Sequence, residues 1–260
     1  MQKTLWMLPV LGWALVTIWS GCSISNVDNA GGLTAYFDSA HVEGCFALYD
    51  NNRGEFLLNN RARYLRRFSP GGTFDVVTAL VGLETGALFN EKTLIGGRTM
   101  ADALKEDSIS YFQELARRIG RDTLVKWIDT LSYGNKNTTG PVDSLGLTGA
   151  MKISPDEQLG LVKRMFFNQL PFQPRTQEVV RSAMIRESNS RYDLAYISGE
   201  ALDSGDRKVG WVVGWVEESV HPYFFVLNIE GSGPGTDLSA TGVDLMRKIL
   251  VSEGFFKGVK

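Results

Sequence analysis

The sequence predicts an α+β fold in which helices flank an antiparallel sheet, and three observations support this fold class. A β-rich segment over residues 45–58 contains a turn signal, as expected for a hairpin. Three segments between residues 73 and 165 carry apolar side chains at helical spacing. Two apolar runs within residues 209–229 then favour strands, and a last helix follows. Strands and helices thus form separate blocks, which is typical of helices packed on an antiparallel sheet.

The expected hairpin comes first. Residues 45–49 (CFALY) are apolar and β-prone, and residues 55–58 (EFLL) are expected to return beside them. The intervening residues 50–54 (DNNRG) form a strong turn signal, because Asp, Asn and Gly tolerate the backbone angles of tight turns. The basic stretch that follows has Arg61, Arg63, Arg66 and Arg67, and we interpret it as a solvated basic face, with a partner contact as the alternative.

Helices are expected in the middle of the chain. Residues 73–85 show helical spacing and stop at Gly86. Residues 107–131 are amphipathic and are expected to break in two at Gly120. Ser154 is followed by Pro155 and by the acid Glu157, a pattern that predicts an N-cap and capping box for a helix running through residue 165.

The C-terminal part returns to strands. Residues 209–216 and 223–229 are apolar enough for buried strands, and residues 231–235 (GSGPG) are expected to form a loop. Residues 243–251 fit a last helix.

The N-terminus has the pattern of an export signal. Lys3 precedes an apolar run over residues 5–19, and Ser20-Gly21-Cys22 then resembles a bacterial lipobox. We predict a lipoprotein-type signal peptide over 1–21, lipid attachment at Cys22, a flexible tether over 22–33 and one domain over 34–260. These assignments predict a bacterial envelope protein on the periplasmic side or the outer surface. The alternatives are an uncleaved membrane anchor and a disulfide between Cys22 and Cys45.

Composition excludes several classes of function. The net charge is −2, so few phosphates would be neutralised and nucleic acid is not an expected partner. Phosphate-binding glycine motifs are missing after strand-like runs. Two cysteines and two histidines, His41 and His221, are too few for a zinc cluster of Cys and His. No cofactor and no metal are therefore expected.

Several segments resemble class D (oxacillinase-type) serine β-lactamases, which belong with the penicillin-binding transpeptidases. The matching segments follow the family's order and cover residues 44–50, 68–74, 79–86, 108–120, 133–135, 152–158, 210–217 and 224–229. The resemblance thus spans about residues 42–251. It implies a β-lactamase/transpeptidase-like antiparallel sheet flanked by helices, with a mainly helical region inserted.

The family's chemistry needs the motif Ser-x-x-Lys, in which the lysine lies one helical turn after the nucleophilic serine. In class D enzymes the resemblance implies that this lysine is carbamylated and acts as the general base. Here residues 70–75 read PGGTFD, so Gly72 stands at the nucleophile position and Asp75 at the general-base position. A glycine cannot attack a carbonyl, and an aspartate has no amine to carbamylate.

Two further family motifs are altered. The Ser-x-Val motif aligns with residues 108–110, where Ser108 is retained either as a proton-transferring hydroxyl or as an ordinary helix N-cap. The Lys-Thr/Ser-Gly motif aligns with Ile197, Ser198 and Gly199, so that isoleucine replaces lysine.

Single family residues are also replaced. The carboxylate-binding arginine aligns with Gly242, and the tryptophan that shields the carbamylated lysine aligns with Gly146. Among hydroxyls near the nucleophile position, Ser69 has Gly72 rather than lysine three residues on, and Thr73 would need an aligned base. Nucleophile, base and cationic edge are therefore missing together.

The sequence therefore predicts a non-catalytic, pseudoenzyme-like member of this family. Its expected partners are a peptide or peptidoglycan-derived ligand, or a protein, with the membrane reached through the lipid anchor. Two alternatives stay open. One is an active hydrolase or penicillin-binding protein that uses relocated groups, with Asp75 as the base for attack by water. The other is a purely structural lipoprotein.

Overall fold

The structure is a computed structural model, and it describes residues 27–147, 149–203, 207–231 and 236–260. The expected leader over 1–21 and the lipid-attachment residue Cys22 lie outside the described residues. Within the described ranges, the helices are all too short or too polar to cross a membrane.

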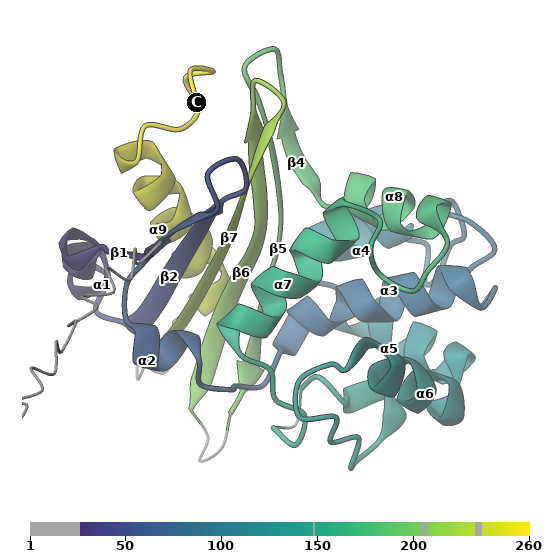
Figure 1. Cartoon of the computed structure of the whole chain (residues 1–260). Helices are drawn as coiled ribbons and strands as arrows, with labels where there is room; N and C mark the ends of the chain where they lie inside the picture. The colour runs from purple at the N-terminus through teal and green to yellow at the C-terminus, as the bar shows by residue number, and fades with distance from the viewer. Residues whose placement is uncertain (1–26, 148, 204–206, 232–235) are drawn as a thin grey trace, which may run out of the picture.

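A sheet runs through the centre of the molecule, in the strand order β1-β3-β2-β7-β6-β5-β4 (Figure 1). The strands are β1 Val27–Asn29, β2 Glu43–Asp50, β3 Glu55–Leu58, β4 Ile185–Ser188, β5 Tyr192–Leu202, β6 Lys208–Glu218 and β7 His221–Gly231. All neighbours pair antiparallel except β1, which runs parallel to β3. The α+β class with an antiparallel sheet is thereby confirmed.

One face of the sheet carries the inserted helical region, and the other carries the terminal helices (Figure 1). The helical region comprises α3 Asp75–Glu84, α4 Met100–Glu106, α5 Ile109–Ile119, α6 Arg121–Leu131, α7 Pro155–Phe166 and α8 Pro174–Ala183. The opposite face carries α1 Thr34–Ser39 and α9 Leu238–Ser252, while the short α2 Arg61–Tyr64 lies beside β2.

Both faces of the sheet are buried, so β6 and β7 are apolar at successive positions. Along β6, Trp211 and Val213 join the core under the helical region, whereas Val212 and Val216 join the core under α9. A strand that is covered on both sides has no solvent-facing positions for polar residues. This covering explains the continuous apolar runs that the sequence shows over 209–216 and 223–229.

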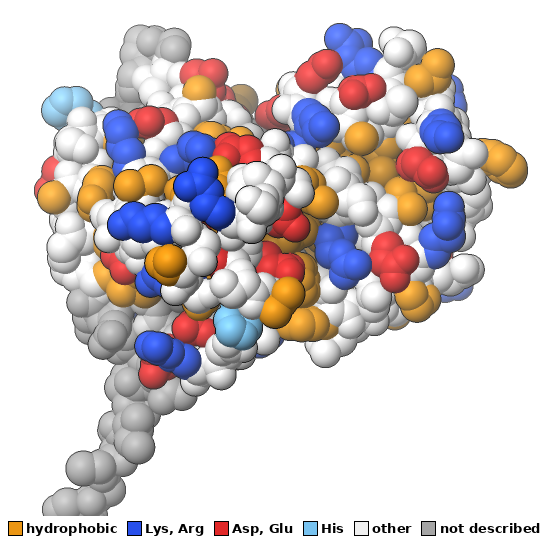
Figure 2. Space-filling model, turned by 90° about the horizontal axis from the view of Figure 1, so that it is seen from above, with side chains coloured by type: hydrophobic (Ala, Val, Ile, Leu, Met, Phe, Trp, Pro, Cys, Tyr) orange, Lys and Arg blue, Asp and Glu red, His pale blue; other side chains and the backbone are white. Residues whose placement is uncertain are grey.

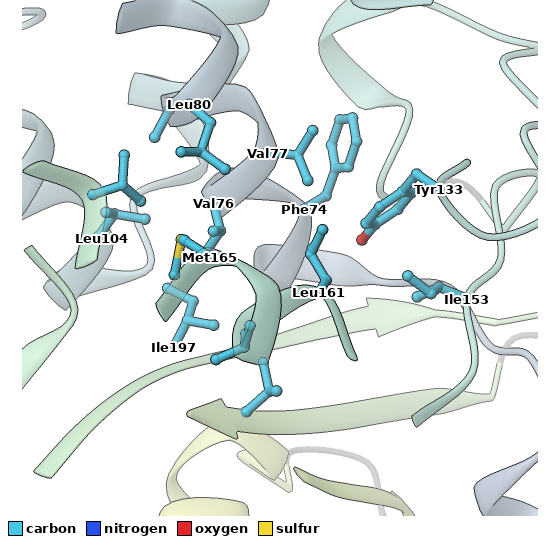
Figure 3. Close-up of a cluster of buried hydrophobic side chains, with 14 of the residues drawn as sticks. Phe74, Val76, Val77, Leu80, Leu104, Tyr133, Ile153, Leu161, Met165 and Ile197 are labelled. Carbon is cyan, nitrogen blue, oxygen red and sulfur yellow. The ribbon is translucent and has the colours of Figure 1, made fainter. Parts of the chain in front are cut away.

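The core on the helical side connects α3 and α7 to the sheet (Figure 3). Val76, Val77 and Leu80 come from α3, and Leu161 and Met165 come from α7. Burial of such side chains contributes roughly 1.5–3 kcal/mol each to folding. The core therefore fixes the start of α3 at Asp75, directly after the segment that contains Gly72.

Local sequence signals place several elements as expected. The hairpin of β2 and β3 forms, and Asp50 stabilises its turn by accepting hydrogen bonds from the backbone of Asn52 and Arg53. Gly120 separates α5 from α6 at φ +80°, a conformation that favours glycine. Ser154 caps α7, and Glu157 completes the capping box.

Other expectations are corrected. Part of the segment expected to be a flexible tether, 22–33, has regular structure: residues 27–29 cover the edge of β3, whose N–H and C=O groups would otherwise lack partners. The last helix begins at Leu238 rather than at residue 243, because the side chain of Asp237 caps it. Arg63 is not part of a solvated face: it is 5% exposed, and its guanidinium donates to Asn228 and Glu230, both at 2.9 Å.

Cys45 and Glu218 are among the buried polar groups of the sheet. The Cys45 thiol is fully buried in β2, and burial raises its pKa to about 12. Glu218, at the end of β6, is fully buried and accepts hydrogen bonds from the backbone N–H groups of Phe256, Val259 and Lys260. The C-terminal residues are therefore tied to the sheet.

Candidate functional site

A cavity of about 430 Å³ opens where the segment Gly71–Phe74 (η2) leads into α3. Its other walls are the junction of α4 and α5, residues 142–147, Glu200 of β5 and the start of α9. We call it the Gly72 cavity. Its volume lies within the range of small-molecule sites. The structure therefore brings together residues 70–75, which align with the Ser-x-x-Lys motif, and Gly199, which ends the segment aligned with the Lys-Thr/Ser-Gly motif.

Gly72 has no free space for a side chain. A Cβ built on Gly72 would lie 2.2 Å from Oδ1 of Asp107 and 3.3 Å from the α-carbon of Gly199. Gly199 is equally confined, because its own Cβ would lie 2.7 Å from the α-carbon of Gly72. The nucleophile position is thus filled by a carboxylate from the α4–α5 junction and closed off by the backbone of β5.

Asp75, at the general-base position, is half-buried, and it lines the Gly72 cavity. Burial raises the pKa of its carboxyl well above the ordinary value, and the negative charge of Asp107 raises it further. Within the described part of the chain, no side chain or backbone group is hydrogen-bonded to this carboxyl. The raised pKa disfavours the ionised form of this carboxyl, which is the form that a general base needs.

Asp107 directly precedes the second motif at 108–110, and its side chain lines the cavity. It ends α4 in the left-handed conformation, at φ +50°, which turns the carboxyl over Gly72. Its pKa is raised to about 6 by burial and by the charges of Glu200 and Asp237. Oδ1 of Asp107 has no accessible surface and no hydrogen-bond partner among the described residues.

Ser108 does not occupy the place that the alignment gave it. The described lining of the Gly72 cavity includes Asp107 and Ile109 but not Ser108. Ser108 stands at the N-cap position of α5, yet its side chain makes no capping hydrogen bond. Asp107 lines the cavity in place of Ser108, because the left-handed turn at Asp107 directs that side chain inward. Asp107 was missed for this reason, although the acidic pair Glu106-Asp107 before the helix was a visible signal.

The third motif is divided between core and cavity wall. Ile197 is 1% exposed and lies among the apolar side chains of Figure 3, near Met165 and Val76, so it presents nothing to the cavity. Ser198 pairs with Val212 of β6 and is not among the described lining residues. Gly199 approaches Gly72 closely, and Glu200, which the alignment did not single out, reaches the cavity.

Gly146 and Gly242 lie in different places. Gly146 lines the cavity, and a Cβ on it would lie 2.9 Å from Cβ of Phe74. The aromatic ring of Phe74, which lies 5.4 Å from the ring of Tyr133, therefore takes space that a larger residue at 146 would need (Figure 3). Gly242 instead lies within α9, where it faces Val212 and Leu227 of the sheet.

The nearby hydroxyls do not form a nucleophile–base pair. Thr73 is 1% exposed and donates to the carbonyl of Pro70 at 2.6 Å. Ser69 is fully buried, and its hydroxyl lies 3.3 Å from Asp203. Thr78 lines the cavity and donates to the carbonyl of Phe74 at 3.3 Å. Of these three, only Thr78 reaches the cavity, and no described lining residue is a lysine or histidine.

The Gly72 cavity is acidic. Its described lining contains the carboxylates of Asp75, Glu106, Asp107, Asp143, Glu200 and Asp237, without any lysine, arginine or histidine. On the face of the molecule seen in Figure 2, by contrast, basic and acidic side chains are interspersed. Among the described residues, no three Asp, Glu, His or Cys side chains converge as metal ligands. The cavity is thus a negative site without a metal-binding geometry.

Comparisons with known proteins agree with this architecture. Residues 44–250 match the family described as penicillin binding protein transpeptidase domain. YbxI of Bacillus subtilis, described as a probable beta-lactamase, is 32% identical over 220 residues, which cover 80% of this chain and 81% of YbxI. The class D β-lactamase FUS-1 (OXA-85) of Fusobacterium nucleatum superposes with a TM-score of 0.82 at 26% identity, covering 88% of this chain and all of that one (100%).

A second solved structure is similar over almost the same length. The C-terminal domain of the BlaR penicillin receptor of Bacillus licheniformis gives a TM-score of 0.79 at 26% identity, covering 88% of this chain and 96% of that domain. Sequence and overall fold thus agree, and the chain belongs to the family of class D β-lactamases and penicillin-binding transpeptidases.

Proposed function

We propose that this chain is a non-catalytic member of the family whose cavity binds a peptide, a cell-wall fragment or a protein partner. The proposal is carried by one observation: the Asp107 carboxylate lies 2.2 Å from the place of a Gly72 Cβ, where a nucleophile's side chain would begin. A side chain cannot be accommodated there unless Asp107 moves.

The electrostatics of the cavity support the same proposal. Acyl transfer in this family needs a base beside the nucleophile, and the raised pKa of Asp75 disfavours the ionised form that could act as this base. This property also argues against the alternative hydrolase, in which Asp75 would activate water. A binding role needs neither group, only the cavity.

The test of catalysis is the intact mass of the protein after incubation with a labelled penicillin, with the class D β-lactamase FUS-1 as the positive control. We expect no change in mass for this chain. A covalent adduct, or β-lactam turnover that Asp75→Ala abolishes, contradicts the proposal. Cell-wall fragments and peptides are then screened by thermal shift, because a ligand that binds only the folded state raises the melting temperature. A purely structural protein shows no such rise.

We also propose that the protein is exported and held at a membrane surface by lipid on Cys22. The support is the apolar run over 5–19 followed by Ser20-Gly21-Cys22. Metabolic labelling with palmitate in a bacterial host tests the assignment. The wild-type chain should incorporate label and Cys22→Ser should not, and equal labelling of the two contradicts it.

A further inference from the structure

We propose that two copies of this chain associate through one face of the helical region, with Phe89 of each copy inserted into a groove between α4 and α8 of the other. This inference goes beyond the proposed function, because the groove and the Gly72 cavity share no described lining residue.

The residue that projects from this face is Phe89, in the connection between α3 and α4. Its side chain is 90% exposed, more than any other large apolar side chain that the structure describes. Aromatic side chains gain strongly from burial and dominate the energetics of cores and interfaces. Phe89 is therefore the side chain of this surface that gains most from a partner.

The backbone on both sides holds Phe89 in place. Before it, Leu88 is fully buried, and its N–H donates to the carbonyl of Gly82 at 2.9 Å. After it, Asn90 begins a turn in which its carbonyl accepts from the N–H of Thr93 at 3.1 Å. A side chain on an ordered backbone loses less conformational entropy on binding, so Phe89 is prepared for contact.

A groove of about 430 Å³ lies next to Phe89, where α4 and α8 pack side by side on the side of the molecule away from α1 and α9 (Figure 1). We call it the α4–α8 groove. Its apolar lining consists of Met100, Ala101, Val179 and Ala183. Glu91 also lines it, only two residues after Phe89, whereas Phe89 itself does not. The groove is thus adjacent to the projecting ring and not filled by it.

This arrangement points to a second copy of the chain as the occupant. A two-fold rotation brings the projecting residue of each copy to the groove of the other, so that one contact forms twice. The projecting ring and the apolar groove, on one rim of the same molecule, supply both halves of that contact. An unrelated peptide in the groove would leave Phe89 in water.

The charges at the rim are self-complementary as well. Glu91, Arg175 and Glu178 line the groove, and none of their side chains is ion-paired within the described part of the chain. A surface that meets its own copy needs both signs of charge, because like charges that face each other oppose association. The rotation allows Arg175 of each copy to face the acids of the other, which sets the orientation of the pair.

Sedimentation velocity between about 1 and 100 µM tests the association, on the full chain with Cys22→Ser in every sample so that lipid cannot contribute. We expect a reversible dimer whose fraction rises over this range. Phe89→Ala should weaken it at least about tenfold, because a central aromatic anchor is lost. Val220→Ala, which shortens another apolar side chain that is 82% exposed, is the control and should leave the dimer unchanged.

A complementary pair of variants tests the reciprocal contact. Ser182→Trp fills the groove from its exposed rim, and Phe89→Ala removes the ring that enters it. Each variant alone should dimerise weakly. A mixture of the two should associate about tenfold more tightly, because the mixed pair retains one Phe89 opposite one open groove. Ser182→Arg replaces the tryptophan variant if the latter loses its cooperative urea transition.

Three results overturn the inference. The first is a chain that stays monomeric at the highest concentration, which leaves the groove to another partner. The second is a dimer that Phe89→Ala does not weaken, and the third is a mixture that associates no better than its components. Each of them leaves the non-catalytic proposal standing, because that proposal depends on the penicillin adduct and on no residue of this groove.

Discussion

At the scale of single residues, the carboxylate of Asp107 lies where a side chain on Gly72 would have to begin. Gly72 and Asp75 were found from the sequence because a fixed spacing defines the motif window. Asp107 and Glu200 were not found from the sequence, because each lies next to an aligned motif and not within it. The alignment singled out Ser108 and Gly199, whereas the neighbouring Asp107 and Glu200 line the cavity. For Asp107, that difference depends on its left-handed conformation, at φ +50°, which spacing alone does not reveal.

A double-mutant cycle measures this competition for space. Gly72→Ala should lower the free energy of unfolding by about 1–3 kcal/mol, because the Asp107 carboxylate must move. In an Asp107→Ala background the same change should have little effect, so the two substitutions are non-additive. Urea denaturation provides all four values. Gly199→Ala serves as the comparison, since its Cβ would meet backbone atoms that Asp107→Ala leaves in place. Additive effects would show that the two residues do not touch.

The raised pKa of Asp107 predicts a pH-dependent stability. Its pKa is about 6 in the folded chain and near 3.8 ordinarily, so the folded state binds more protons between these values and loses stability as pH rises through them. Asp107→Asn removes the charge and should therefore stabilise the protein at pH 8, by about 2 kcal/mol after allowance for partial exposure.

The gain should be much smaller near pH 4, where the wild-type carboxyl is almost fully protonated in the folded state and partly protonated in the unfolded state. Urea denaturation at pH 4, 6 and 8 measures it, with Asp129→Asn as the surface control. A difference that does not change with pH contradicts the assigned cause.

At the scale of elements, the sequence predicted those with strong local signals. The hairpin turn at 50–54, the break at Gly120 and the start of α7 at Ser154 each rest on residue types with a specific backbone role. α4 and α8 were not predicted; in the structure both pack on α3 and on each other. β5 was expected only through the family resemblance, since Ser198, Gly199 and Glu200 interrupt its apolar pattern.

Two serines at helix starts give a matched prediction. Ser154 accepts a hydrogen bond from the backbone of Glu157 at 3.2 Å, so Ser154→Ala should lower the free energy of unfolding by about 1 kcal/mol. Ser108 stands at the same position of α5 without a capping bond, so Ser108→Ala should change it by less than about 0.5 kcal/mol. Thermal and urea denaturation compare the variants. An equal loss for both would mean that α5 is capped by Ser108 after all.

At the scale of the whole molecule, backbone hydrogen bonds to Glu218 of β6 hold the C-terminal residues against the sheet. Deleting residues 256–260 removes the backbone donors of Glu218 and leaves a fully buried carboxylate without them. We expect a loss of at least about 3 kcal/mol in the free energy of unfolding. Glu218→Gln in the truncated chain should recover part of it, because a neutral amide is less costly to bury. Full stability after truncation, measured by urea denaturation, would contradict this role.

The burial of Cys45 has a practical consequence for measuring how often the sheet opens. A thiol whose pKa is about 12 carries almost no thiolate at pH 8, and the strands around it exclude an alkylating reagent. Since Cys22 is the chain's only other cysteine, Cys22→Ser leaves a single reactive group at the centre of the fold. The rate at which that group takes up iodoacetamide then reports the exposure of β2, without an added probe.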